Sequence, residues 1–173
     1  MTYLDNLEFF GNTNKVDDFI DTLKSGNFLF SLVISYTETC EIPTVTFAGA
    51  DKDSIKYTSP ADAEYLYYGY CKTIDKIPMT PDGKPTPALL TKTALESCSI
   101  PHIVINAGSK LAPQLPYIQT GLISGKNISV ESAMTDSQVS QAVDYGRMVG
   151  RTLASMTDCL IIGESIPGGT TTA

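Results

Sequence analysis

Apolar runs alternate with amphipathic segments along the chain, and this alternation predicts strands separated by helices. Residues 27–39 (NFLFSLVISYTET) begin with a nearly continuous apolar run, which is typical of a strand buried on both faces. Shorter apolar runs predict further strands at residues 43–50 (PTVTFAGA), 101–109 (PHIVINAGS) and 158–162 (DCLII). We therefore expect an α/β fold, with a mostly parallel sheet and helices on both faces in a Rossmann-like, three-layer arrangement.

Helical periodicity is clearest towards the two ends of the chain. Residues 14–26 (NKVDDFIDTLKSG) repeat apolar positions at helical spacing and end at a glycine. Thr135 and Gln138 form a capping-box pattern ahead of residues 139–154, because a hydroxyl and an amide at this spacing can satisfy each other's free backbone donors. A helix is expected at each place.

A third helix is expected to begin with Ser59 as its N-cap and Pro60 in its first position. Asp62 and Glu64 follow, and we interpret them as acidic charges that complement the positive end of this helix rather than as ligands. The tyrosines within residues 65–70 (YLYYGY) are interpreted as core or interface residues, with the floor of an aromatic base pocket as the alternative.

Residues 76–90 (KIPMTPDGKPTPALL) contain four prolines and predict a constrained loop, since proline lacks a backbone donor and restricts the residue before it. A fourth helix is expected to follow, with Thr86 as its cap, Pro87 in its first position and residues 88–97 as its body. No domain boundary is visible here, and the loop is equally a candidate wall of an active site.

Composition narrows the class of protein. The 173 residues are 42% hydrophobic and 18% charged, with a net charge of −7, which is globular composition without the clustered basic residues of a nucleic-acid binder. No apolar run is long enough to cross a membrane, and the N-terminal residues do not resemble a secretory signal, so we expect a soluble cytoplasmic protein.

We expect no cofactor. The cysteines are widely spaced and predict free thiols rather than disulfides; they are Cys40, Cys71, Cys98 and Cys159. His102 is the only histidine, which disfavours a histidine-rich metal site or a Ser-His-Asp triad, and we interpret it as structural.

The most informative motif is residues 163–173 (GESIPGGTTTA), directly after the last predicted strand. Ligands of open parallel sheets bind beyond the carboxyl ends of the strands, where glycine amides can approach an anion and threonine hydroxyls add donors. The predicted phosphate- or nucleotide-binding residues are Gly163, Glu164, Ser165, Gly168, Gly169, Thr170, Thr171 and Thr172. An exposed, frayed terminus is the alternative interpretation.

The spacing of this motif also matches a P-loop, except that Gly169 stands where that loop has its lysine. That lysine reaches the β- and γ-phosphates of a triphosphate, so its absence favours a ligand with a single phosphate. A lysine-less, P-loop-like nucleotide binder stays open as an alternative.

Residues 134–173 resemble the helix, strand and phosphate loop of nicotinate-nucleotide–dimethylbenzimidazole phosphoribosyltransferases, whose loop is of the Gly-Glu-Met-Gly-Ile-Gly-Asn-Thr-Thr type. Gly163-Glu164 match its opening pair, Gly168 matches the glycine before its asparagine, Gly169 replaces that asparagine, and Thr170-Thr171 match its threonine pair. The likeness is closer to the archaeal branch of the family and extends, in the same order, over further segments: 41–50 (EIPTVTFAGA), 58–66 (TSPADAEYL), 79–95 (MTPDGKPTPALLTKTAL) and 100–108 (IPHIVINAG).

The resemblance implies that residues 1–173 form a nucleotide-binding α/β domain, the N-terminal part of a longer phosphoribosyltransferase. Its reaction moves ribose phosphate from nicotinate mononucleotide to a benzimidazole-type base in the synthesis of the lower ligand of cobamides. The family's catalytic glutamate is expected downstream, so no residue of this chain inherits that role and the chain alone is expected to be inactive. A nucleotide-phosphate-binding module without this catalysis is the alternative, which the substitution at Gly169 keeps open.

Residues after two other predicted strands are candidate walls of the same site: Thr37, Glu38, Asn106, Gly108 and Ser109. Ordinary strand-to-helix turns are the alternative there. The expected partners are the two small-molecule substrates and a second copy of the chain in a homodimer, with no nucleic acid, no membrane and no metal.

Overall fold

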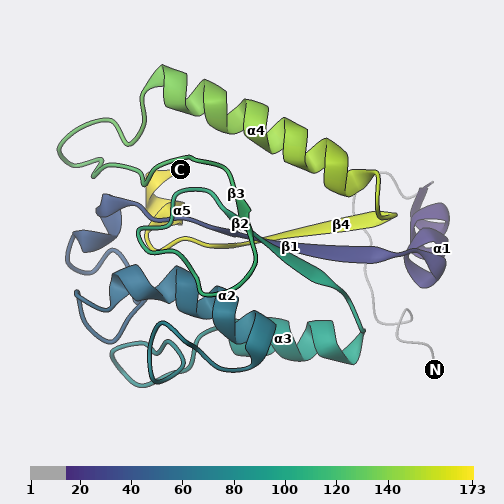
Figure 1. Ribbon diagram of the computed structural model, residues 1–173, viewed down its shortest axis with the longest axis horizontal. Helices are drawn as coiled ribbons and strands as arrows, with labels where there is room; N and C mark the ends of the chain where they lie inside the picture. The colour runs from purple at the N-terminus through teal and green to yellow at the C-terminus, as the bar shows by residue number, and fades with distance from the viewer. Residues whose placement is uncertain (1–14) are drawn as a thin grey trace.

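A parallel sheet organises residues 15–173, the part of the chain that the computed structural model describes (Figure 1). Its strands are β1 (Phe28–Ile34), β2 (His102–Asn106), β3 (Ile118–Gln119) and β4 (Cys159–Ser165). They pair in the order β3-β2-β1-β4, and every pairing is parallel. The carboxyl ends of all these strands therefore meet at one edge of the sheet.

Helices lie on both faces of this sheet. Figure 1 shows α2 (Thr58–Tyr68) and α3 (Ala88–Ser97) together on one face and α4 (Asp136–Ala154) across the other. The remaining elements are α1 (Val16–Ser25), the short α5 (Gly169–Thr172) and the 3₁₀ turns η3 (Glu38–Glu41) and η4 (Ile55–Tyr57). The three-layer α/β fold that the apolar pattern predicts is confirmed.

The main core lies between the sheet and the α2–α3 layer. Alternate side chains of β1 point into it, as the two-residue period of a strand requires: Phe30, Leu32 and Ile34. They pack against Ala63, Leu66, Leu95, Val104 and Leu115. Burying each large apolar side chain contributes about 1.5–3 kcal/mol, so this layer holds α2 firmly against the sheet.

The opposite face is covered less completely. Leu153 is the only buried residue of α4. Ile162 of β4 is 69% exposed, and β4 is an edge strand among the described residues. A parallel sheet is normally covered on both faces, so this edge and the α4 side present apolar surface that such sheets usually bury.

The local helix signals are mostly confirmed. Thr135 and Gln138 make both bonds of the capping box: the Thr135 N–H donates to Gln138 Oε1 (2.7 Å) and the Gln138 N–H donates to Thr135 Oγ1 (3.3 Å). The helix predicted at residues 88–97 is α3, but its N-cap is Pro87 rather than Thr86, so Pro87 precedes the helix instead of taking its first position. The Thr86 hydroxyl, one residue further out, accepts a hydrogen bond from the N–H of Ala88. The first helix is α1, with Gly26 as its C-cap.

Ser59 is not an N-cap. Helix α2 begins at Thr58, and the Ser59 hydroxyl lies near the carbonyl oxygens of Ser165 (2.7 Å) and Ser35 (3.0 Å), to which it can donate. These acceptors belong to the ends of β4 and β1. Tertiary acceptors therefore take a hydroxyl that local sequence would assign to the helix end.

The strand predicted at residues 43–50 is wrong. Thr44 has a φ of 71°, in the left-handed region, which interrupts the extended backbone that a strand needs. The segment forms turns instead, and Phe47 is 76% exposed. Its apolar residues serve a pocket rather than a sheet.

Two further predictions concern the environment of the protein. All four cysteines are free, as their spacing predicts. Over residues 15–173, no helix is both long enough and apolar enough to cross a membrane. The prediction about a secretory signal concerns residues 1–14, which lie outside the described residues.

Candidate functional site

A pocket of about 400 Å³ lies beside the end of β4, at the carboxyl edge of the sheet; we call it the edge pocket. Its walls come from residues 45–49, from Thr58 and Asp62 of α2, from residues 78–80 and 86–87, and from residues 165–171. The proline loop is thus one of its walls. Asp62 is the only ionisable residue among the described residues that line it.

The glycine–threonine segment contributes one whole side of the edge pocket. Five of the predicted phosphate-binding residues line it: Ser165, Gly168, Gly169, Thr170 and Thr171. Thr170 and Thr171 stand in the first turn of α5, where backbone N–H groups have no acceptor within the helix. Thr172 lies outside the pocket, where its hydroxyl donates to the carbonyl of Gly168 (2.9 Å) and contacts the hydroxyl of Thr37 (3.2 Å).

Gly163 and Glu164 do not line the edge pocket. They border a neighbouring cavity of about 220 Å³, which also contacts Asp62. A Cβ on Gly163 would lie 2.6 Å from the ring of Phe30, so this glycine is required by packing. Glu164 is exposed.

Packing also requires a glycine at position 168. Gly168 has a φ of 72°, and a Cβ there would lie 3.0 Å from the backbone of Cys40. Gly168, one of the glycines that suggest a ligand cradle in the sequence, therefore first allows this loop to pass close to Cys40 of η3. Gly168 and Gly169 also line the edge pocket, so this loop has a packing role as well as a place in the pocket wall.

Asp62 is a buried carboxylate that lines the edge pocket, with 8% of its surface exposed. Its Oδ1 accepts from the Thr86 hydroxyl (2.7 Å), and its Oδ2 accepts from the Ser165 hydroxyl (2.8 Å). None of the ion pairs among the described residues includes it. Burial raises the pKa of Asp62 from 3.8 to about 6, and the two hydroxyl groups oppose this rise only in part.

Glu64, two residues along the same helix, has the opposite environment. Its carboxylate accepts backbone hydrogen bonds from Lys72 (2.6 Å), Thr73 (2.7 Å) and Gln114 (2.8 Å), and also a bond from the Thr73 hydroxyl. Burial raises the pKa of Glu64, but these bonds outweigh burial and hold it below 4.5. Glu64 is therefore a structural carboxylate that fixes two loops to α2, whereas Asp62 faces a pocket.

Thr58 is a second polar residue of α2 that lines the edge pocket. Its Oγ1 is buried and has no hydrogen-bond partner among the described residues. Thr58 and Asp62 are four residues apart on α2 and so lie on one face of the helix. Both line the edge pocket.

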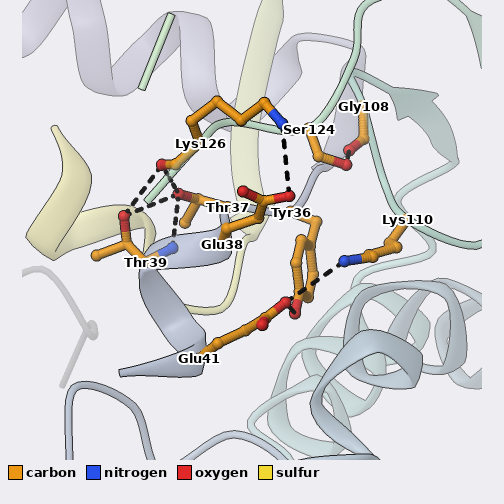
Figure 2. Close-up of polar contacts among 9 residues, drawn as sticks. All are labelled: Tyr36, Thr37, Glu38, Thr39, Glu41, Gly108, Lys110, Ser124 and Lys126. Atoms are coloured by element: carbon orange, nitrogen blue, oxygen red, sulfur yellow. Dashed lines mark hydrogen bonds and ion pairs between the residues drawn. The ribbon is translucent and has the colours of Figure 1, made fainter. Parts of the chain in front are cut away.

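The candidate wall residues after β1 form a polar cluster of their own, shown in Figure 2. The hydroxyl groups of Thr37 and Thr39 lie 3.1 Å apart, and both reach the carbonyl of Lys126 (3.3 Å). Glu38 pairs with the Lys126 ammonium at 3.8 Å. This cluster ties the turn after β1 to residues 125–126 and does not line the edge pocket.

A second set of contacts in Figure 2 joins the turns after β1 and β2. The Tyr36 hydroxyl donates to Glu41 Oε1 (2.9 Å), and Lys110 pairs with the same oxygen at 3.4 Å. Burial, with hydrogen bonds to Cys40 and Glu41, raises the pKa of Tyr36 well above its ordinary value. The hydrogen bond from Tyr36 lowers the pKa of Glu41.

The candidate wall residues after β2 form a turn. Asn106 Oδ1 accepts from the N–H groups of Gly108 (3.1 Å) and Ser109 (2.8 Å). A Cβ on Gly108 would lie 2.6 Å from the backbone of Ile123. Among the described residues, Thr37 is the one candidate wall residue with a hydrogen bond to the glycine–threonine segment, through Thr172.

The sequence interpretation missed Asp62, which it treats as a helix-start charge, and Thr58. Residues 45–49, assigned to a strand, also belong to the pocket. The tyrosines of residues 65–70 do not line it. One sequence signal could have singled out Asp62: residues 58–66 are mostly apolar or hydroxyl-bearing and contain no basic residue that could pair with an acid.

Comparison with known proteins finds similar sequences in archaea. No family model matches the chain. A UPF0284 protein of Archaeoglobus fulgidus is 51% identical over 151 residues, which cover 87% of this chain and 45% of that protein. The homologues of this chain are archaeal UPF0284 proteins.

Two further relatives give the same result. A UPF0284 protein of Pyrococcus furiosus is 44% identical over 146 residues, covering 84% of this chain and 44% of that protein. One of Sulfurisphaera tokodaii is 40% identical over 153 residues, covering 88% and 44%. The chain spans less than half the length of these relatives. Their names state no activity, so any functional proposal must be argued from the edge pocket.

Proposed function

We propose that this chain is the nucleotide-binding part of a phosphoribosyltransferase that moves ribose phosphate from nicotinate mononucleotide to a benzimidazole-type base. In this reaction the bond from C1 of the ribose to the nicotinate nitrogen breaks. A new bond forms from C1 to the unprotonated ring nitrogen of the base, and the N–H proton of the other ring nitrogen passes to the downstream glutamate that the resemblance implies. The protein must hold a phosphate and a flat heterocycle next to each other.

The observation that carries the proposal is the composition of the edge pocket. The glycine–threonine segment and a buried carboxylate both line it, together with apolar and proline residues, and the two are joined by the hydrogen bond from Ser165 to Asp62. Neutral N–H and hydroxyl donors suit a phosphate at the Thr170–Thr171 side. A carboxylate repels a phosphate, so we place the phosphate away from Asp62.

The size of the pocket agrees with this arrangement. A volume of about 400 Å³ lies within the range of small-molecule sites. The described residues place no lysine or arginine in its wall, and the P-loop lysine is replaced by Gly169. A triphosphate with its magnesium ion would lack the positive charge that such ligands normally receive.

A calorimetric titration tests this assignment. It uses the extended protein, by which we mean this chain within a protein of the full length of its relatives. Nicotinate mononucleotide should bind without magnesium and more tightly than ATP. Tight, magnesium-dependent binding of ATP would instead support a P-loop-like nucleotide binder and overturn the proposal.

A pair of variants locates the phosphate. Replacing both Thr170 and Thr171 by alanine should weaken nicotinate mononucleotide binding by about tenfold or more, because charge-assisted hydrogen bonds contribute about 1.5–3 kcal/mol each. Thr93→Ala is the control, since its exposed hydroxyl donates to the carbonyl of Leu89 in the same helix and has no other partner in the described part of the chain. Equal affinity of both variants and the unmodified protein would mean that the threonines do not hold the phosphate.

A further inference from the structure

The outer edge of β4 is a long strand edge with which no strand of residues 15–173 pairs. The other edge of the sheet is β3, which is only two residues long, and a very short strand is one of the ways in which proteins protect a sheet edge. β4 has seven residues, and Ile162 on it is 69% exposed. Of the two edges, β4 is therefore the one that needs a covering element.

An apolar groove lies between α4 and the sheet; we call it the α4 groove. Its volume is about 260 Å³, and it extends from Ile105 of β2 across Val33 of β1 to Leu160 and Ile162 of β4. α4 forms the opposite wall, and among its residues only Leu153 is buried. The groove therefore reaches the strand whose outer edge is open.

Two glycines of α4, Gly146 and Gly150, line the same groove. A Cβ at either position would meet nothing within 4 Å among the described residues, so the packing of this part of the chain does not require a glycine there. Glycine in the interior of a helix is less favourable than alanine, because it loses more backbone freedom on folding. The distance between packed helices depends on the side chains at their contact, so small residues allow a close approach. The two glycines therefore indicate a second helix packed against this side of α4.

The connections of the sheet indicate on which face such a helix belongs. α2 and α3 connect β1 to β2 over one face, and α4 connects β3 to β4 in the opposite direction over the other face (Figure 1). Opposite directions on opposite faces give both connections the same hand, and connections between parallel strands are almost always right-handed. A strand added beside β4 continues the direction from β3 to β4, so its connecting helix belongs on the α4 face. That face carries the α4 groove.

We propose that, in the extended protein, the segment that follows residue 173 packs a helix into the α4 groove and adds a parallel strand to the outer edge of β4. A strand, a crossover helix and a second parallel strand together need about 30 residues. The relatives are more than twice as long as the part that this chain matches, which leaves ample length for the addition. The inference concerns how the sheet is completed and does not depend on the proposed reaction.

Gly146→Ala and Gly150→Ala in the extended protein test for the helix. If a helix fills the groove, each added methyl group is crowded, and the urea midpoint of unfolding should fall. If the groove is open, the better helix propensity of alanine should raise the midpoint instead. Ser140→Ala is the matched control, because Ser140 is an exposed residue of α4 outside the groove; its midpoint should stay the same or rise slightly.

Hydrogen exchange of the unmodified extended protein tests for the strand. Along an edge strand, about half of the backbone N–H groups point away from the sheet and have no partner strand. With a strand added beside β4, nearly all amide hydrogens of residues 159–165 should exchange slowly, because both sides of β4 are paired. This measurement needs no variant, so a glycine variant that fails to fold cannot hide the result.

Three outcomes overturn the inference. Higher midpoints for both glycine variants would mean that no helix fills the groove, and fast exchange of about half of the β4 amides would mean that no strand pairs with its edge. A second copy of the chain is the other possible occupant. If the midpoint rises with protein concentration and Ile162→Gln dissociates a dimer seen in sedimentation, the groove is the contact between two copies.

Discussion

Glu64→Gln should lower the free energy of unfolding by about 3–6 kcal/mol, and the contacts of Glu64 give this magnitude. Glutamine keeps one acceptor oxygen and replaces the other with an NH₂ group. The least costly orientation turns the NH₂ towards the Thr73 hydroxyl, which can accept, and leaves the N–H of Gln114 facing a donor. One charge-assisted bond is then lost, about 1.5–3 kcal/mol, and the other three lose their charge, about 0.5–1 kcal/mol each.

The assay is urea unfolding followed by circular dichroism at pH 7. A domain of ordinary stability has about 5–15 kcal/mol, so the loss should shift the transition midpoint strongly. Glu96→Gln is the control, because Glu96 is 66% exposed and, within residues 15–173, pairs only with Lys92 in the same helix; it should change the stability by at most about 1 kcal/mol.

The dependence on pH gives a second check. The pKa of Glu64 is lowered in the folded state, so its contribution is fully present above its ordinary value of 4.5 and is lost as the pH falls through the folded-state value. The difference between the unmodified protein and Glu64→Gln should therefore shrink in acid. A loss of less than about 1 kcal/mol at pH 7 would refute the role assigned to Glu64.

Two further predictions concern the pocket. Asp62→Asn should stabilise the chain by about 3 kcal/mol at pH 8, since the pKa of Asp62 rises from 3.8 to about 6 on folding and its charged form is the disfavoured one. In thermal unfolding this gain should disappear as the pH falls from 6 towards 4, and a variant that is less stable than the unmodified chain at pH 8 would contradict the assigned cost. Gly168→Ala should destabilise the chain by about 1–3 kcal/mol, through its positive φ and the crowding against Cys40. Gly83→Ala separates the two effects, because Gly83 has a similar φ of 81° and a Cβ there would meet nothing within 4 Å; equal losses in both variants would rule out the crowding.

The sequence predicts the sheet well because its signals are strong and local to each element. The strands β1, β2 and β4 are apolar runs of the kind that parallel sheets bury on both faces, and the capping box of α4 needs only residues three apart. Residues 43–50 share the composition of a strand, but their backbone has a positive φ at Thr44 and at Gly49, which composition does not reveal.

The candidate site is predicted in part for a related reason. The glycine–threonine segment lies where the topological rule for parallel sheets places ligands, so its position follows from the strand before it. The role of Asp62 depends instead on which groups surround it after folding, namely Thr86 and Ser165 from distant parts of the chain. Asp62 and Glu64 look alike in sequence, and only their partners separate a pocket carboxylate from a structural one.

Release of nicotinate from nicotinate mononucleotide is the most direct test of the central proposal. The extended protein and the 173-residue chain alone are incubated with the nucleotide, with and without benzimidazole, and nicotinate and the ribosylated base are quantified by chromatography. We expect nicotinate and ribosylated base to form in equal amounts, only when benzimidazole is present and only with the extended protein. Nicotinate release that does not depend on the base, or no release at all despite tight binding of the nucleotide, would contradict phosphoribosyl transfer.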